Sequence, residues 1–305
     1  MNKSIQVQKV AQLTGHNGGI YALEPTTDPR FLLSAAGDGW IVKWDMEKPE
    51  LGKLLAKVET QIFALKYLED LNMVVAGNMN GGVHWVDLQN PEHTLNIQHH
   101  RKGVFGFEHV GDFLFSIGGD GILTKWSILE KRSVESLQLS YESLRSIQYA
   151  KDRAELIIGA SDRNIYFVDA QNLSIKHTIT QAHDSSVFSL YYHVQKQQLF
   201  SGGRDAYLKI WQLNSTYDCK SSQAAHLFTI NAIAFHPEEQ LFATASRDKT
   251  IKIWDSHTFK LLKVIETIRD DGHLNSVNAL YWSTHKNYLL SASDDRTICA
   301  WKVNI

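Results

Sequence analysis

The sequence predicts an all-β protein, a seven-bladed β-propeller, and three repeated features carry this prediction. A short motif centred on tryptophan recurs seven times, at intervals of 40 to 47 residues. An Asp or Asn stands six residues before each centre, and an apolar residue stands three residues before it. This period is that of a four-stranded propeller blade. We therefore expect residues 1–305 to form a single domain.

The motif itself is clearest in five copies: IVKWD (41–45), LTKWS (123–127), LKIWQ (208–212), IKIWD (251–255) and ICAWK (298–302). Two weaker copies, VHWVD (83–87) and IYFVD (165–169), fill the gaps between them. The seven centres are Trp44, Val86, Trp126, Val168, Trp211, Trp254 and Trp301. The apolar residue before each centre is what a strand buried between two neighbouring blades requires.

Two further columns place the turns and the innermost strand of each unit. The residues six before the centres are Asp38, Asn80, Asp120, Asp162, Asp205, Asp248 and Asp295. Asp and Asn favour tight turns because their side chains bond the local backbone, so each marks a turn between adjacent strands. Five units begin with a histidine: His16, His100, His183, His226 and His273. A branched apolar residue four positions later starts the innermost strand.

These residues resemble the WD40 family. The Gly-His pair, the turn Asp and the Trp-Asp pair match the family pattern across essentially the whole chain. The resemblance implies a WD40-type propeller with seven four-stranded blades around a channel. It also implies a non-catalytic platform for other proteins, with no cofactor.

The two ends of the chain are expected to complete one blade. The seventh unit continues for only four residues after Trp301 and has no outer strand of its own. Residues 5–13 (IQVQKVAQL) have strand composition. We infer that this N-terminal strand joins the last blade, which closes the ring and removes exposed strand edges.

A hydroxyl stands four residues before the turn Asp in the five units that also have the histidine and the tryptophan. The sets are His16, Ser34, Asp38 and Trp44; His100, Ser116, Asp120 and Trp126; His183, Ser201, Asp205 and Trp211; His226, Thr244, Asp248 and Trp254; and His273, Ser291, Asp295 and Trp301. The resemblance implies that each set is a buried hydrogen-bond chain. Donors and acceptors match in the order Trp, Ser, His, Asp.

Units 2 and 4 lack these polar residues together. Val58, Ala76 and Val86 occupy the three positions in unit 2, and Ser140, Ile158 and Val168 occupy them in unit 4. A half-satisfied buried network costs more than an apolar replacement, so a joint loss indicates a structural role for the network.

Ser, His and Asp together also suggest a hydrolase, which we consider and set aside. Nucleophilic catalysis needs one exposed serine beside an oxyanion hole, whereas here five buried copies are expected. A propeller hydrolase with a metal in the channel would need convergent carboxylates or histidines, which the equivalent inner-strand positions do not supply. We assign no catalytic residue and no metal ligand.

Two positions per unit should be displayed on the end that carries the histidine loops and Asp turns, called the top face. One follows the branched apolar residue of the innermost strand, and the other precedes the turn Asx. The candidates for partner binding are Tyr21, Phe63, Phe105, Arg145, Phe188, Arg204 and Arg247. Aromatic residues and Arg are enriched in binding hot spots, and arginines favour an acidic or phosphorylated peptide. In the alternative, the aromatic rings pack between blades and the arginines only face solvent.

The composition narrows the classes of partner. The net charge of −2, without a basic run, gives no clear nucleic-acid signal. No apolar run approaches the ~20 residues of a membrane span, and the two cysteines, Cys219 and Cys299, have neither metal-ligand nor disulfide-scaffold spacing. We expect an intracellular, cytoplasmic protein, monomeric outside a complex, that binds a protein or peptide. The alternative is a substrate-recruiting subunit of a larger complex.

Overall fold

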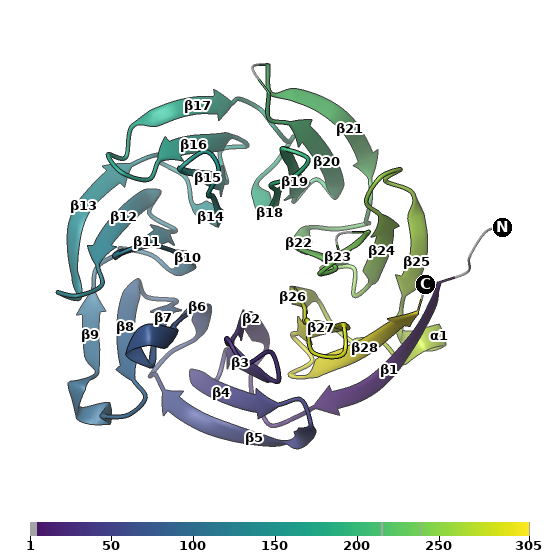
Figure 1. The fold of residues 1–305 in the computed structure, drawn as a ribbon, viewed down its shortest axis with the longest axis horizontal. Coiled ribbons are helices and arrows are strands. Elements are labelled where there is room, and N and C mark those ends of the chain that lie inside the picture. The colour runs from purple at the N-terminus through teal and green to yellow at the C-terminus, as the bar shows by residue number, and fades with distance from the viewer. Residues whose placement is uncertain (1–4, 215, 239, 305) are drawn as a thin grey trace. The chain divides into compact units, whose positions relative to one another are not determined.

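The protein consists of seven four-stranded antiparallel sheets (Figure 1), in a computed structural model that describes residues 5–214, 216–238 and 240–304. Each sheet is called a blade here and is numbered in the order of the predicted units. Among the described residues, no helix is long and apolar enough to cross a membrane. The predicted number of blades and of strands in each blade is confirmed.

The chain divides into two compact units, Met1–Asn72 with Asn231–Ile305 and Met73–Ile230. In the first unit, blade 1 consists of β2 (Ile20–Pro25), β3 (Phe31–Ala36), β4 (Trp40–Asp45) and β5 (Lys48–Lys57). Blade 6 consists of β22 (Ile230–Phe235), β23 (Leu241–Ser246), β24 (Ile251–Asp255) and β25 (Leu261–Ile265). Blade 7 consists of β26 (Val277–Trp282), β27 (Tyr288–Ser293), β28 (Ile298–Asn304) and β1 (Gln6–Leu13), and the short helix α1 (Thr267–Asp270) precedes it.

The second unit contains three complete blades. Blade 3 consists of β10 (Val104–Val110), β11 (Phe113–Gly118), β12 (Ile122–Ser127) and β13 (Arg132–Gln138). Blade 4 consists of β14 (Leu144–Ala150), β15 (Glu155–Ala160), β16 (Ile165–Asp169) and β17 (Ile175–Ile179). Blade 5 consists of β18 (Val187–His193), β19 (Gln198–Gly203), β20 (Tyr207–Gln212) and β21 (Asp218–Ala224).

Blade 2 contains the boundary between the units. It consists of β6 (Ile62–Leu68), β7 (Met73–Asn78), β8 (Gly82–Asp87) and β9 (Leu95–Gln98), with the 3-10 helices η1 (Glu69–Leu71) and η2 (Pro91–His93) between them. Only β6 and η1 belong to the first unit. The expectation that residues 1–305 form a single domain stays a prediction.

The apolar core lies between neighbouring blades. In the second unit, one cluster joins Phe115 and Leu123 of blade 3 to Leu156 and Val168 of blade 4. A second cluster of the same kind links blades 4 and 5. The second strand of each blade is therefore buried on both faces, which is why its sequence is mostly apolar or small instead of alternating.

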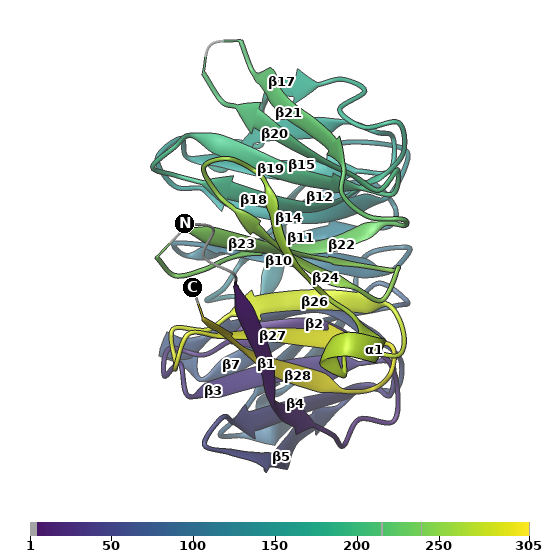
Figure 2. The same cartoon turned by 90° about the vertical axis from the view of Figure 1, so that its right-hand side faces the viewer.

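The N-terminal strand completes blade 7, as predicted. β1 pairs antiparallel with β28, from Gln6 opposite Asn304 to Leu13 opposite Ile298. Figures 1 and 2 both show the purple β1 alongside the yellow β28. Leu13 is fully buried, in a cluster that joins blades 7 and 1. The first and last strands of the chain thus share one sheet and leave no unpaired edge on β28.

Removal of β1 tests how much the protein depends on this pairing. We expect deletion of residues 1–13 to cost at least about 4 kcal/mol, because it exposes the edge of β28 and removes the buried Leu13. In a chain of this size that corresponds to a melting temperature about 10 °C lower, measured by calorimetry. A deletion of residues 1–4 alone, which leaves β1 intact, is the control. A protein without residues 1–13 that melts at the wild-type temperature would contradict the closure.

Candidate partner-binding site

The five blades that contain the full set of His, hydroxyl, Asp and Trp are called the regular blades. A buried hydrogen-bond chain stabilises the top-face loop and turn of these blades, and blade 3 shows the complete chain. The Trp126 indole N–H donates to Ser116 Oγ (2.9 Å). Ser116 Oγ lies 2.8 Å from His100 Nε2, and His100 Nδ1 lies 3.1 Å from Asp120 Oδ1. Every donor finds an acceptor if the hydroxyl donates to Nε2 and Nδ1–H donates to the carboxylate.

The same chain is present in blades 1, 5 and 7. Trp to hydroxyl distances are 2.8 Å in all three, and hydroxyl to histidine distances are 2.7 to 2.8 Å. In blade 6, the Trp254 indole donates to Thr244 Oγ1 (2.9 Å). The serine hydroxyls lie on residues with no solvent exposure. Their oxygens are enclosed and hydrogen-bonded, which is not the environment of an attacking nucleophile.

The chain also ties the loop before the first strand to the turn between the second and third strands. Asp120 accepts from the Arg101 backbone N–H (2.9 Å), directly after His100. A backbone bond from Gly119 N–H to Gly103 O (2.8 Å) lies beside it. The two display positions of each unit are thereby held next to each other.

Blades 2 and 4 replace the chain in different ways. In blade 4, Ser140 and Tyr166 both donate to Asp162 Oδ2, at 2.6 and 2.5 Å, and Ser140 Oγ accepts from the Glu142 backbone N–H. Blade 4 thus retains a polar link that the expected joint loss did not anticipate. In blade 2 the three positions are apolar, and the fully buried Trp85 indole N–H has no partner among the described residues.

Truncation of one hydroxyl tests the structural role of the chain. We expect Ser116→Ala to lower the free energy of unfolding by roughly 2 to 4 kcal/mol, because it leaves the Trp126 N–H and His100 Nε2 without a buried partner. Urea unfolding followed by fluorescence measures this. Ser133→Ala, on the outer strand β13, is the control and should change stability by less than about 0.5 kcal/mol. Equal stabilities of the two variants would show that the chain does not hold the blade.

The turn carboxylate in blade 3 adds a dependence on pH. Burial opposes its ionisation, but hydrogen bonds from His100 and from the Arg101 and Ile122 backbones outweigh burial and lower the pKa of Asp120 from 3.8 to about 2. Because the folded-state pKa is the lower one, its stabilisation is complete above about pH 4. That stabilisation, about 2 kcal/mol, is lost as the pH falls through about 2.

This dependence predicts how Asp120→Asn compares with the wild type. The urea midpoint of the variant should lie clearly below that of the wild type at pH 7, and the gap should narrow between pH 4 and pH 2. The same comparison with Asp112→Asn, at an exposed loop position before β11, is the control. A gap that does not change with pH would contradict the carboxylate's role.

The residues predicted to face the top sit at β-bulges. In five blades the register between the first two strands skips one residue, and the skipped residues are Tyr21, Phe105, Arg145, Phe188 and Asn278. A bulge leaves one residue unpaired and re-aims its side chain. The backbone bulge, and not strand pairing, therefore sets the first display position. Side chains of very different chemistry can occupy it for this reason.

In the first unit these positions serve mainly to link neighbouring blades. The Tyr21 and Phe63 rings meet edge to face with centroids 5.1 Å apart. Asn278 Nδ2 donates to Ile20 O (3.1 Å), and Asn231 Nδ2 donates to Val277 O (2.9 Å). Tyr21 and Phe63 are half-buried. Packing between blades therefore accounts for part of the burial of Tyr21 and Phe63. This packing is the alternative to partner binding that was considered for the aromatic candidates.

In the second unit three candidates meet in one stack. The Arg145 guanidinium lies over the Phe105 ring (4.5 Å to the centroid) and over the Phe188 ring (5.1 Å). Arg145 Nε donates to Ser161 Oγ (3.0 Å). Two aromatic rings and one hydroxyl thus contact this half-buried cation, and its two terminal nitrogens remain for a ligand.

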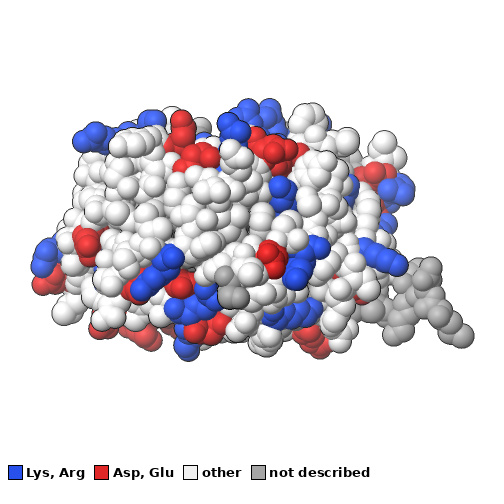
Figure 3. All heavy atoms as spheres, turned by 90° about the horizontal axis from the view of Figure 1, so that it is seen from above, with Lys and Arg blue, Asp and Glu red and all other residues white. Residues whose placement is uncertain are grey.

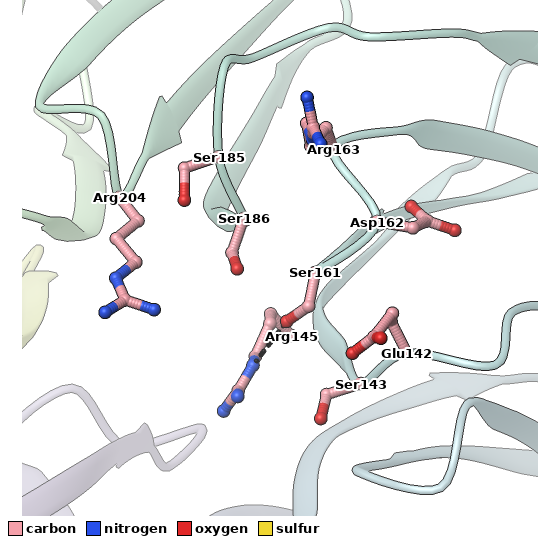
Figure 4. A pocket seen from close by; sticks show the side chains of 9 residues that line it. All are labelled: Glu142, Ser143, Arg145, Ser161, Asp162, Arg163, Ser185, Ser186 and Arg204. Atoms are coloured by element: carbon pink, nitrogen blue, oxygen red, sulfur yellow. Dashed lines mark hydrogen bonds between the residues drawn. The ribbon is translucent and has the colours of Figure 1, made fainter.

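A hollow of about 560 Å³ opens beside this stack (Figure 4). Its lining residues are Glu142, Ser143, Arg145, Ser161, Asp162, Arg163, Ser185, Ser186 and Arg204. Figure 4 shows the Arg145 and Arg204 side chains extending toward the same side of the hollow, whereas Arg163 points away from them. The Ser161, Ser185 and Ser186 side chains lie between or beside the two arginines.

Two equivalent backbone pairs build this hollow. Ser161 N–H bonds Ser143 O (2.7 Å) in blade 4, and Arg204 N–H bonds Ser186 O (2.8 Å) in blade 5. Blade 1 has glycine at both members of the corresponding pair, as does blade 3. Serine or arginine stands in blades 4 and 5 where blades 1 and 3 have glycine, and these side chains provide the hydrogen-bond donors of the hollow. The sequence columns contain this difference, but it was not used to predict a hollow.

The hollow is lined by three arginines and two carboxylates, Glu142 and Asp162, so its formal charge is positive. No ion pair of Arg145, Arg163 or Arg204 is present among the described residues, and Asp162 is engaged by Ser140 and Tyr166. Burial and the nearby charge of Arg204 lower the pKa of Arg145, with Glu142 opposing them. The site therefore favours an anion.

The remaining candidate, Arg247, lies outside the hollow, and two exposed side chains stand at a position that the sequence did not single out. Arg247 is exposed in the first unit and does not line the hollow. Tyr141, directly before Glu142, is 94% exposed, and Leu227 is 82% exposed at the equivalent position after a histidine. The position after the histidine column is thus a third display position, which alignment on the innermost strand did not reveal.

No group of three or more His, Cys, Asp or Glu side chains in the described part of the chain is arranged to hold a metal ion. Lys and Arg side chains are interspersed with Asp and Glu on the surface seen in Figure 3. Arginines that form no ion pair among the described residues, beside aromatic rings and hydroxyls, are the candidate functional feature that the geometry brings together.

The chain belongs to the WD40 family (WD domain, G-beta repeat), whose profile matches residues 7–45, 174–212, 217–255 and 262–302, just over half of the chain. The fold is that of the crystal structure of the WD40 β-propeller domain of Doa1, with a TM-score of 0.85, 18% identity and 97% of each chain covered. The predicted WD40-type seven-bladed propeller is confirmed. Members of this family are generally non-catalytic interaction scaffolds.

The curated relatives match only part of the chain. The chain is similar to autophagy-related protein 16 of Arabidopsis thaliana (24% identity, 54% of this chain, 33% of the relative). It is also similar to WD repeat-containing protein SL1-17 of Schistosoma mansoni (22%, 55% and 56%). Eukaryotic translation initiation factor 3 subunit I of Schizosaccharomyces pombe is a third relative (21%, 65% and 65%). The matched region spans less than two thirds of the length of each relative.

Proposed function

We propose that the protein is a non-catalytic interaction scaffold that binds an acidic segment of a partner protein in the hollow of blades 4 and 5. The observation that carries this proposal is the half-buried Arg145, which contacts two phenylalanine rings and forms an ion pair with no carboxylate among the described residues. Arg204, an exposed arginine without an ion pair in the described part of the chain, adds a second cation to the lining. We call these two arginines, with Ser161, Ser185 and Ser186, the arginine site.

The physical argument is that a partly desolvated charge without a counterion is costly, and an incoming anion removes that cost. Charge-assisted hydrogen bonds contribute about 1.5 to 3 kcal/mol each. The stack on Phe105 and Phe188 fixes the guanidinium in advance, so that little side-chain entropy is lost when a partner binds. A preformed cation therefore favours binding more than a flexible surface arginine does.

The names of the relatives support a protein partner. One relative is a subunit of a translation initiation factor, and another is named as a protein of the GATOR2 complex. By this analogy the chain acts within an assembly, and recruitment of a substrate to that assembly is the second candidate function. Binding by Tyr21, Phe63 and Arg247, a cytoplasmic location and a monomeric state outside the assembly stay predictions.

Loss of one arginine tests the proposal. We expect Arg204→Gln to weaken binding of acidic partner peptides at least tenfold, because one charge-assisted contact is removed. Fluorescence anisotropy with a pool of 11-residue peptides, rich in Asp and Glu at randomised positions, measures the affinity.

The control keeps the change in net charge and moves it away from the site. Arg132→Gln removes an exposed arginine of β13, in the same unit, and should bind the pool as the wild type does. Equal loss in both variants would indicate non-specific attraction. Wild-type binding by Arg204→Gln, or no saturable binding by the wild type, would refute the arginine site.

A further inference from the structure

We propose that the anion recognised by the arginine site is the phosphoryl group of a phosphorylated serine or threonine, and that an apolar neighbour of that residue rests on Tyr141. This inference depends on the proposed function and makes it specific. Three features favour a phosphorylated over an acidic peptide: the hydrogen-bond donors of the hollow, the charge of its arginines, and the exposed Tyr141, the neighbour in sequence of a lining residue.

The donors around the hollow match a group with three oxygens. Arg145 offers its terminal nitrogens, since its guanidinium contacts two phenylalanine rings and its Nε donates to Ser161. Arg204 extends toward the same side of the hollow. Because Ser161 Oγ accepts from Arg145, its own hydroxyl hydrogen remains available, and Ser185 and Ser186 bring two more hydroxyls to the lining.

Charge favours the phosphoryl group over a carboxylate. The two arginines carry two positive charges that no acidic side chain of the described chain neutralises by an ion pair. A phosphorylated serine carries about −1.5 to −2 at neutral pH and three strong acceptor oxygens, whereas a carboxylate carries one charge and two oxygens. A single carboxylate would leave one guanidinium and several hydroxyls unpaired, which costs affinity.

Tyr141 supplies a second contact of a different kind. Its side chain is 94% exposed, and the next residue in the chain, Glu142, lines the hollow. Glu142 is held in place because its backbone N–H bonds Ser140 Oγ, which in turn donates to Asp162. An extended peptide advances about 3.3 Å per residue, so a side chain one to three positions from the phosphorylated residue can reach this ring. Rigid, exposed aromatic side chains of this kind are common binding anchors.

The test compares three pools of 11-residue peptides that differ only at the centre, which is phosphoserine, glutamate or serine, with randomised neutral flanks. By anisotropy, the phosphoserine pool should bind the wild-type protein at least tenfold more tightly than the glutamate pool. The serine pool should not bind. Arg204→Gln should abolish the preference, and Arg132→Gln should retain it.

The other possible outcomes of this experiment distinguish failure of this inference from failure of the proposed function. Equal binding of the phosphoserine and glutamate pools would overturn this inference and leave the acidic-segment proposal standing. Binding of neither pool would refute both. Inorganic phosphate that binds as tightly as the phosphoserine pool would also overturn the inference, since the site would then take a free anion and not a peptide.

The contribution of Tyr141 is tested separately. Within the phosphoserine pool, peptides with leucine near the centre should bind the wild type severalfold better than those with serine there. Tyr141→Ser should remove this preference. Leu129→Ser, which removes a 90% exposed apolar side chain at the opposite end of β12 from the Asp120 turn, should retain it. The absence of any preference in the wild type would refute the apolar contact.

Discussion

The hydrogen bond between the histidine ring and the turn carboxylate is the constraint on which each regular blade depends. In blade 3 it connects His100, in the loop before the first strand, to Asp120, in the turn between the second and third strands. The ring is buried, so its other nitrogen must also be paired, and Ser116 and then Trp126 follow from that need. Four residues from four parts of the blade thereby become one unit, which explains why the histidine, the hydroxyl and the tryptophan are present or replaced together.

The same constraint has a consequence for the surface. With the loop and the turn held together, the backbone beside them has little freedom, and the bulge at the start of the innermost strand places one side chain of each blade at the rim. Because that residue is skipped by the register, its chemistry is not restricted by strand pairing. Asn278 can serve there as a link between blades, while Arg145 serves as a cation held between rings. The backbone is thus fixed at the repeated positions, whereas the side chains at the display positions differ from blade to blade.

Sequence columns could predict the fold and the network, because both arise from residues at fixed spacing. Trp126, Asp120 and His100 each occupy a column of the repeat, and the pairing of β1 followed from a missing outer strand. The columns also identified Arg145, Phe105 and Phe188 as displayed residues, but they could not show that the arginine lies between the two rings. That arrangement depends on the rotation of three side chains from three blades, which spacing along the chain does not determine. The hollow was missed for a related reason, since Ser161 and Ser186 are ordinary residues until their backbone bonds place them beside two arginines.

Blade 4 shows how departure from the repeat can create a site. Ser140 stands where other blades have the histidine, and Tyr166 bonds the turn Asp162 from a different strand position. The smaller link still anchors the loop, through Ser140 Oγ and the Glu142 backbone N–H, but it no longer requires an imidazole at the loop's start. The turn carboxylate is satisfied from within its own blade and does not pair with the arginines nearby. Asp162 is thus engaged by its own blade just as Asp120 is in blade 3, and the arginines beside it have no ion pair among the described residues, which supports the proposed anion site at this blade.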